Sequence, residues 1–258
     1  MNDRPALLEQ ALSALKEAAR CLTRARAHSG GLVWNEREPK APIDQELNDV
    51  VLARLHSTGI AVLSEESDGA EWPSHDPMWI IDPLDGTFNF SRELGPCAVS
   101  ICLWRGNSPD FGAILDVHTG DIAWGGGAYG AWRKVRLAVS QISRIENAAL
   151  CTGFPSSFDF HSGSQLEDWK NLASRFGKVR MLGSAASSLL LVAQGSAECY
   201  YEDKIQIWDV AAGLALVEGA GGVGKLEADS GNTTVRLLAS NRALANELLG
   251  SVSAIKSP

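Results

Sequence analysis

The sequence predicts an α/β protein, more closely an α+β layered sandwich of sheets and helices. Between residues 96 and 136, successive apolar runs have the length and alternation of β-strands and are separated by turn residues. After residue 146 such runs alternate with stretches of helical period, which is the pattern of layered α/β architectures. Since 45% of the 258 residues are hydrophobic, the chain can fill the core of one large domain or two small ones.

The first predicted elements are two helices and two short strands. Leucines recur with a helical period over residues 5–27, which predicts a helix whose first turn accommodates Pro5. The stretch "EREPKAPID" predicts a loop. A second helix is expected to follow Asp44 and to end at Gly59. The apolar stretches "IAVLSEE" and "MWIIDP" then predict two strands that end close to acidic residues.

The rest of the chain divides into a strand-rich part and an alternating part. Strands are predicted for "CAVSICLW", "FGAILDV", "DIAWGGG" and "AWRKVRLAV". The alternating part is predicted to contain the strand "NAALCTG", a helix at 164–176, the strand "KVRML", a helix at 184–194, the strand "AECYY", a helix at 207–219, the strand "VRLLASN" and a helix at 241–249. A soft boundary near residues 140–146 separates an N-terminal half, 1–140, from a C-terminal half, 141–258, and we expect the two to form one compact unit.

Composition argues against several classes of function. The net charge of −8 and the lack of a Lys/Arg cluster argue against a nucleic-acid partner. The start "MNDRPALLEQ" lacks the apolar stretch of a signal peptide, and no apolar run approaches the ~20 residues of a membrane span. The five cysteines are scattered, and Cys97 and Cys102 are expected on opposite faces of a strand, which makes a zinc pair or a disulfide a poor interpretation. We therefore expect a cytoplasmic protein.

The stretch "MWIIDPLDGTFNF" places two acids where an apolar strand ends. Pro83 is expected to stop the strand ladder after Asp82, and Gly86 allows a close approach of the backbone. In such a turn Asp82 and Asp85 can aim at one point, where two carboxylates repel unless a cation or a proton lies between them. Hard oxygen ligands favour Mg²⁺ or Mn²⁺ over zinc. The alternative is a helix N-cap, which an isolated D-x-x-D favours.

Further acids stand at comparable places in the chain. "LSEES" puts Glu65 and Glu66 at another strand end, and "IWDVAAGLALVEGAGG" puts Asp209 in the first turn of an otherwise apolar helix. Taken alone, Asp209 is an acid that the helix dipole favours, and the glutamates are solvated turn residues. "GAGGVG" matches a dinucleotide-binding pattern, but it follows a helix and opens none, so it predicts only a helix end and a turn.

Taken together, "LSEES", "WIIDPLDGTFNF" and "IQIWDVAAG" resemble the inositol monophosphatase superfamily. The resemblance runs from about Asp44 to about Gly222 and includes "LGSAASSLLLVAQGSAECYYED". It implies an αβαβα arrangement of helices and sheets in a homodimeric, Mg²⁺-dependent phosphatase. It also implies that the N-terminal half carries most metal ligands, while the C-terminal half carries the substrate-binding segment and Asp209.

The resemblance also implies roles for individual residues. The first metal would be held by Glu65, Asp82 and the carbonyl of Leu84, and the second by Asp82, Asp85 and Asp209. A weaker third metal would be held by Glu65, with Asp44 acting through water. Thr87 paired with Asp44 would activate the attacking water, and the backbone N–H groups of Gly86 and Thr87 would receive the phosphate. The substrate's hydroxyl groups would meet Gly183, Ser184, Ala185, Glu202 and Asp209.

Several of these residues have a simpler interpretation. Pro42 and Ile43 stand where family members commonly carry a threonine, so Asp44 is alternatively only the N-cap of the second helix. Ser184 is alternatively the N-cap of the helix at 184–194, and Glu202 an exposed acid at a strand end. Gln206 stands where inositol-type members often carry a histidine.

The expected function is Mg²⁺-dependent hydrolysis of a small phosphate monoester, an inositol monophosphate or a similar polyol or sugar phosphate, by metal-activated water. Within the same fold the alternatives are phosphatases of histidinol phosphate, fructose 1,6-bisphosphate or 3′-phosphoadenosine 5′-phosphate. An alternative of another class is a non-catalytic regulator that binds metal or a phosphorylated ligand. Two or three Mg²⁺ ions are expected as cofactors, and Mn²⁺ is a possible substitute.

Overall fold

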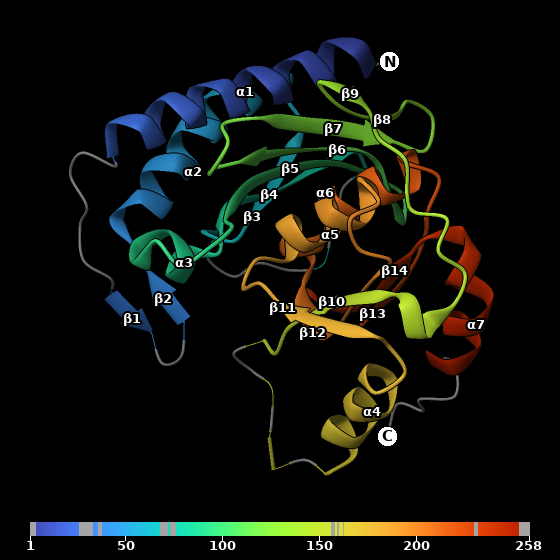
Figure 1. Ribbon diagram of the computed structural model, residues 1–258. Helices are drawn as coiled ribbons and strands as arrows, with labels where there is room; N and C mark the ends of the chain where they lie inside the picture. Colours follow the sequence, from blue (N-terminus) through green and yellow to red (C-terminus); the bar gives the residue numbers. More distant parts are fainter. Residues whose placement is uncertain are drawn as a thin grey trace.

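Helices and two large sheets stack in five layers (Figure 1). The computed structural model describes residues 4–25, 33–35, 38–67, 72, 76–155, 158, 160–161, 163–229 and 232–252. The layers are, in order, α1 (Arg4–Ala25) with α2 (Pro42–Leu55), a seven-stranded sheet, α5 (Ala185–Ala193) with α6 (Ile207–Gly219), a five-stranded sheet, and α4 (Gly163–Ala173) with α7 (Arg242–Val252). This order confirms the predicted αβαβα arrangement.

The seven-stranded sheet is built from the first half of the chain. Its neighbouring strands are antiparallel except for β3 and β4, which run parallel. Side chains alternate between its faces, so that Trp79 and Ile81 pack with α1 and α2 while Met78 and Ile80 pack with the middle layer. Its strands in order are β3 (Ala61–Ser64), β4 (Met78–Asp85), β5 (Ala98–Arg105), β6 (Ser108–Asp116), β7 (Ile122–Gly126), β8 (Gly130–Arg133) and β9 (Val135–Arg136).

The outer helices pack on this sheet through the apolar stripes that predicted them, including the buried Leu8, Leu15 and Leu22 of α1. α2 begins at Pro42, two residues before Asp44, so the prediction that the helix follows Asp44 is wrong. Proline is favoured in the first turn of a helix because its missing N–H would have no partner there. Asp44 therefore lies inside the first turn of α2.

α6 begins and ends where the sequence predicts, and it lies between the two sheets with nearly every side chain buried. Two glycines allow the close packing. A Cβ on Gly112 of β6 would lie 2.4 Å from the carbonyl oxygen of Ala212, and one on Gly213 would lie 2.5 Å from Cβ of Leu189 in α5. Any larger residue at these positions would push α6, and Asp209 with it, away from its neighbours.

The five-stranded sheet comes from the second half of the chain in the order β11-β10-β12-β14-β13. β10, β11 and β12 run parallel, and β14 is antiparallel to both of its neighbours. Its outer face packs with α4 and α7 around Leu150, Tyr201 and Leu238. Its strands are β10 (Ala149–Thr152), β11 (Lys178–Met181), β12 (Cys199–Gln206), β13 (Val223–Ala228) and β14 (Thr234–Ser240).

The sequence prediction missed several strands. The stretch predicted as a loop contains β2 (Glu38–Lys40), which pairs with β1 (Val33–Asn35), and β13 was not predicted. The predicted strand at 131–139 divides into β8 and β9 at Lys134, whose φ of 57° turns the chain. Two short 3-10 turns are also present, η1 (His56–Thr58) and η2 (Ile145–Asn147).

The described helices include none long and apolar enough to cross a membrane. The division of the chain into two halves near residue 140 stays a prediction.

Candidate metal centre and active site

A bulge at the end of β4 brings Asp82 and Asp85 to the same face of the sheet. Residues three apart on a regular strand point to opposite faces. Here Asp82 pairs with Ser100 and Asp85 with Ala98, so the strand carries one residue more than its partner between the two acids. The prediction that Pro83 stops the ladder is therefore wrong, because pairing resumes at Asp85.

Asp209 reaches this face from the middle layer. It lies in the first turn of α6, whose start is tied to β5 because the hydroxyl of Ser100 donates to the Trp208 carbonyl oxygen at 3.2 Å. Carboxylate oxygens of Asp82, Asp85 and Asp209 all lie within 4.8 Å of one another. Acids 127 residues apart in the chain, from 82 to 209, thus meet at one point.

Burial and mutual repulsion raise the pKa values of these acids. The pKa of Asp82 is well above its ordinary value, mainly because of burial and then because of the negative charges of Glu65, Asp209 and Asp85. Burial and the charges of Asp85 and Glu65 do the same to Asp209. Burial raises the pKa of Asp85 to about 6, although hydrogen bonds from residues 184–186 oppose the rise. Ionising all three acids together is therefore unfavourable unless a cation offsets their charges.

The donor set fits a hard divalent cation. Asp82 is 0% exposed, and its Oδ1 accepts the backbone N–H of Leu84 at 2.9 Å. Its Oδ2 is buried without a hydrogen-bond partner within the described part of the chain. A buried carboxylate oxygen without a donor is costly, and a cation would satisfy it. Three carboxylates without histidine or cysteine suit Mg²⁺ or Mn²⁺.

Glu65 and Leu84 lie at the edge of this cluster. Glu65 is half-buried just after β3, and its backbone N–H donates to the carbonyl oxygen of Ile81 at 3.3 Å. The negative charge of Glu65 contributes to the raised pKa of Asp82. The roles of Glu65 and of the Leu84 carbonyl as ligands stay predictions.

Asp44 contacts Thr87 across 43 residues of sequence. Thr87 opens α3 (Thr87–Arg92), and its hydroxyl lies 3.2 Å from Oδ1 of Asp44 and 3.1 Å from the Leu84 carbonyl oxygen. The hydroxyl has one hydrogen, so it donates to one of these acceptors at a time. The other carboxylate oxygen of Asp44 accepts the Ala41 N–H at 2.6 Å.

Asp44 therefore stabilises the start of α2 and also pairs with Thr87. The N-cap residue of α2 is Ala41, so the interpretation of Asp44 as the N-cap is wrong. Asp44 instead lies in the first turn of the helix, where its side chain accepts the backbone N–H of the N-cap residue. Burial raises the pKa of Asp44 to about 6 against the lowering effect of the hydrogen bond from Ala41, and the charge of Glu65 adds to the rise.

The start of α5 holds Asp85. The Ser184 hydroxyl and the Ala186 N–H each donate to Oδ2 of Asp85 at 2.6 Å, and the Ala185 N–H donates to Oδ1 at 3.2 Å. Ser184 is also the N-cap of α5, since its oxygen accepts the Ser187 N–H. Residues predicted to meet substrate thus hold a predicted metal ligand, and their contact with substrate stays a prediction.

Two turns from distant parts of the chain touch beside Asp85. Gly86 has a φ of 88°, and a Cβ there would lie 3.0 Å from the carbonyl oxygen of Gly183. The Asn89 amide donates to the carbonyl oxygens of Pro96 at 2.8 Å and Leu182 at 2.7 Å. Asn89 was not predicted as a site residue, because its partners lie on turns whose proximity no local pattern shows.

Glu202 is a buried residue of β12 and not an exposed strand-end acid. It is 7% exposed, and the Tyr200 hydroxyl donates to its Oε2 at 2.9 Å. Burial raises the pKa of Glu202 to about 7, although the hydrogen bond from Tyr200 lowers it, and the charge of Asp85 adds to the rise.

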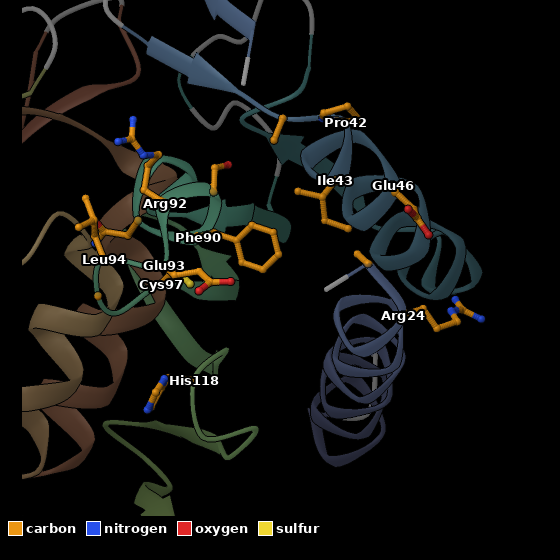
Figure 2. Close-up of a pocket in the computed structure, with 15 residues that line it drawn as sticks. Arg24, Pro42, Ile43, Glu46, Phe90, Arg92, Glu93, Leu94, Cys97 and His118 are labelled. Atoms are coloured by element: carbon orange, nitrogen blue, oxygen red, sulfur yellow. The ribbon is translucent and has the colours of Figure 1, made fainter. Parts of the chain in front are cut away.

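A cavity of about 1140 Å³ opens between α2 and α3 (Figure 2). Ile43 and Phe90 point toward one another across it, and each belongs to a helix that carries one member of the Asp44 and Thr87 pair. Among the described residues, those that line the cavity include none of the predicted metal or substrate residues. The cavity therefore adjoins the site without being its predicted substrate pocket.

Comparisons with known proteins show what the whole chain is similar to. The sequence model of the Inositol monophosphatase family matches residues 4–256. The chain is 33% identical over 227 residues to an inositol-1-monophosphatase of Mesorhizobium japonicum, with 85% of each protein covered. It is 32% identical over 189 residues to a fructose-1,6-bisphosphatase/inositol-1-monophosphatase of Aquifex aeolicus, covering 73% of this chain and 71% of the relative. The structure of the extragenic suppressor protein suhB from Bartonella henselae superposes with a TM-score of 0.81 at 26% identity, covering 96% of this chain and 98% of that one.

Proposed function

Because the chain belongs to the inositol monophosphatase family, we propose that it hydrolyses a small phosphate monoester, an inositol monophosphate or a similar polyol or sugar phosphate, with Mg²⁺ as cofactor. Family members are metal-dependent phosphatases of small phosphorylated substrates. The observation that carries the proposal is the meeting of Asp82, Asp85 and Asp209 beside the hydrogen-bonded pair of Asp44 and Thr87.

The carboxylates would hold two ions. Asp82 would contribute to both, with Glu65 and the Leu84 carbonyl at the first, and with Asp85 and Asp209 at the second. The buried, unpartnered Oδ2 of Asp82 supports a bridging role. Bound Mg²⁺ supplies acidified water and offsets the repulsion between carboxylates and a phosphate dianion. We further propose that a third ion binds near Glu65 and Asp44, and that Mn²⁺ can replace Mg²⁺.

Thr87 and Asp44 would remove a proton from the attacking water. The Thr87 hydroxyl can accept a proton from water while it donates its own to Asp44, because Oδ1 lies 3.2 Å from Oγ1. The Ala41 N–H on the other oxygen fixes the carboxylate in this orientation. This contact counts against the alternative of a non-catalytic regulator, whose only support was the altered sequence before Asp44.

Substrate would lie beside the two touching turns. The backbone N–H groups of Gly86 and Thr87 would receive the phosphate, and Gly86 has no side chain to block them. The start of α5, with Asp209, would meet the hydroxyl groups, and Glu202 would accept hydrogen bonds from them. Because the Aquifex aeolicus relative is a fructose-1,6-bisphosphatase/inositol-1-monophosphatase by name, fructose 1,6-bisphosphate is the second candidate substrate.

A phosphate-release assay tests the proposal. Purified protein is offered myo-inositol 1-phosphate, fructose 1,6-bisphosphate, histidinol phosphate and 3′-phosphoadenosine 5′-phosphate, each with Mg²⁺, with Mn²⁺ or with EDTA. We expect Mg²⁺-dependent release that is strongest with a polyol or sugar phosphate. Asp82→Asn is expected to lower kcat at least ~10²-fold, whereas Asp49→Asn, an exposed change on α2, is the matched control. If the protein binds metal normally but releases phosphate from none of these substrates, the result would favour the alternative of a non-catalytic regulator.

The resemblance further leads us to propose a homodimer in the cytoplasm, with the chain divided near residue 140 into the two halves described above. Light scattering of the purified protein tests the dimer, and a single mass near twice 27.6 kDa is expected. A monomer at all concentrations would contradict it.

A further inference from the structure

Glu202 is fixed by a tyrosine of its own strand. Tyr200 and Glu202 are two residues apart on β12, so their side chains share one face. Tyr200 is 1% exposed, and its hydroxyl donates to Oε2 of Glu202 at 2.9 Å. Because the ring is packed in the core between the two sheets, the hydroxyl cannot follow a moving carboxylate. The hydrogen bond therefore favours one position of Glu202.

Gly153 lies against the same carboxylate. β10 pairs with β12 in parallel, with Thr152 beside Tyr201, so the next residue, Gly153, comes beside Glu202. A Cβ on Gly153 would lie 2.8 Å from Oε2 and 3.0 Å from Oε1. The carboxylate occupies the space that any other residue at position 153 would fill.

This arrangement leaves a defined acceptor. A carboxylate that accepts the Tyr200 hydroxyl through Oε2 still offers lone pairs on Oε1. The negative charge of Asp85 also acts on this carboxylate. A group that fits beside a buried carboxylate must bring hydrogen-bond donors. Hydroxyl groups of a polyol provide them, and a plain aromatic ring does not.

We propose that Tyr200 and Gly153 are positioning residues that set substrate specificity, because they hold Glu202 where its free oxygen accepts a hydrogen bond from a substrate hydroxyl. The inference rests on the proposed function and adds the residues that make the site prefer a polyol phosphate to a phosphate ester without such hydroxyls. Neither residue touches the reacting phosphate. Their effect is therefore expected in recognition of the polyol and not in the chemical step.

The test compares two substrates and two neighbouring tyrosines. Tyr200→Phe removes only the hydroxyl. Tyr201→Phe is the matched control, because Tyr201 is also buried, at 3% exposed, but packs on the opposite face of β12 with α4 and α7. The substrates are myo-inositol 1-phosphate and p-nitrophenyl phosphate, both measured with Mg²⁺.

Tyr200→Phe is expected to raise KM for myo-inositol 1-phosphate about tenfold, equivalent to about 1.4 kcal/mol, with kcat changed less than about threefold. The kinetics of Tyr200→Phe with p-nitrophenyl phosphate are expected to stay within about twofold of wild type. The kinetics of Tyr201→Phe are expected to stay within the same range with both substrates. Gly153→Ala should also weaken recognition of the inositol substrate, because the added methyl group displaces the carboxylate. Equal losses on both substrates, or no loss on either, would overturn the inference.

Binding separates a failure of this inference from a failure of the proposed function. Calorimetry with Mg²⁺ compares wild type and Tyr200→Phe for myo-inositol 1-phosphate and for inorganic phosphate. If wild type releases no phosphate from any ester, the proposed function fails, and the inference still predicts about tenfold weaker binding of the inositol ester alone. If wild type hydrolyses the inositol ester and Tyr200→Phe binds both ligands as wild type does, only the inference fails.

Discussion

Replacing Asp82 by asparagine is predicted to stabilise the metal-free protein near neutral pH while it destroys the metal centre. Asp82 is fully buried, and the negative charges of Glu65, Asp209 and Asp85 act on it. Asparagine has nearly the same shape, keeps an oxygen for the Leu84 N–H and brings an NH₂ group that can donate to the acids around it. The change removes a charge that only a cation or a proton can offset.

The neighbouring Asp85 gives the scale of the effect. Its pKa of about 6 lies about two units above the ordinary value, and one unit corresponds to about 1.4 kcal/mol. Ionising one such carboxyl in the metal-free protein therefore costs ~3 kcal/mol of stability at pH 7. At about 2–4 °C per kcal/mol for a chain of this size, relief of that cost raises Tm by ~6–12 °C.

The sign of the pH dependence follows from the raised pKa. The folded state binds protons more tightly than the unfolded chain between about pH 4 and about pH 6, so the contribution of these acids to stability falls as pH rises through that window. Because the pKa values of Asp82 and Asp209 lie well above their ordinary values, the fall continues beyond it. The advantage of Asp82→Asn should therefore be largest near neutral pH and vanish near about pH 4.

Thermal melts followed by circular dichroism measure this effect. Wild type, Asp82→Asn and the exposed control Asp49→Asn are melted in EDTA and in Mg²⁺ at about pH 4.5 and about pH 7.5. In EDTA at the higher pH, Asp82→Asn should melt above wild type and the control should match it. Mg²⁺ should raise Tm of wild type and of the control but not of Asp82→Asn. The reasoning is refuted if Asp82→Asn melts below wild type in EDTA, or if Mg²⁺ stabilises it as much as wild type.

Three further predictions follow from the same contacts. Thr87→Ala should lower kcat more than it raises KM, because the hydroxyl acts on the attacking water, and steady-state kinetics showing the reverse would make Thr87 a binding residue. Gly86→Ala should lower the free energy of unfolding in urea by about 1–2 kcal/mol, because φ is 88° and the added Cβ meets the Gly183 carbonyl, and an unchanged midpoint would contradict this. Ser184→Ala should weaken Mg²⁺ binding at least about tenfold by calorimetry, because it frees Asp85 from a 2.6 Å hydrogen bond, and an unchanged Kd would show that the backbone donors suffice.

Local patterns predicted the helices best. α6 was predicted to its first and last residue, because apolar residues fill all its sides between a start at Ile207 and the turn after Gly219. The stripe of leucines in α1 predicted the first residue of that helix to within one position. Period and composition are properties of a short window, so a sequence read in order is enough for them.

Strand pairing and bulges could not be predicted in the same way. β13 and the β1–β2 pair depend on partners that a window does not include. The continuation of β4 past Pro83 depends on its pairing with β5, in which two residues of β4 lie opposite the single residue Val99. Pairing with a distant strand outweighed the local signal of proline.

For the candidate site too, the sequence predicted individual residues but not the contacts between distant parts of the chain. The residue types and their order in the chain were enough to single out Asp82, Asp85 and Asp209, and the structure brings them together. The contacts that hold them were not foreseen. Ser184 meets Asp85 from 99 residues away, and Asn89 reaches Leu182 from 93 residues away. Such contacts are set by how the two sheets pack on α5 and α6.

The central claim is that these acids meet in order to hold divalent ions. The most direct measurement is anomalous diffraction from crystals of the protein soaked in Mn²⁺, which replaces Mg²⁺ at oxygen-rich sites and scatters more strongly. The anomalous map should show manganese bound by Asp82, with Asp85 and Asp209 as neighbours. A map without a peak among these three carboxylates, or with its only peaks elsewhere on the molecule, would contradict the claim.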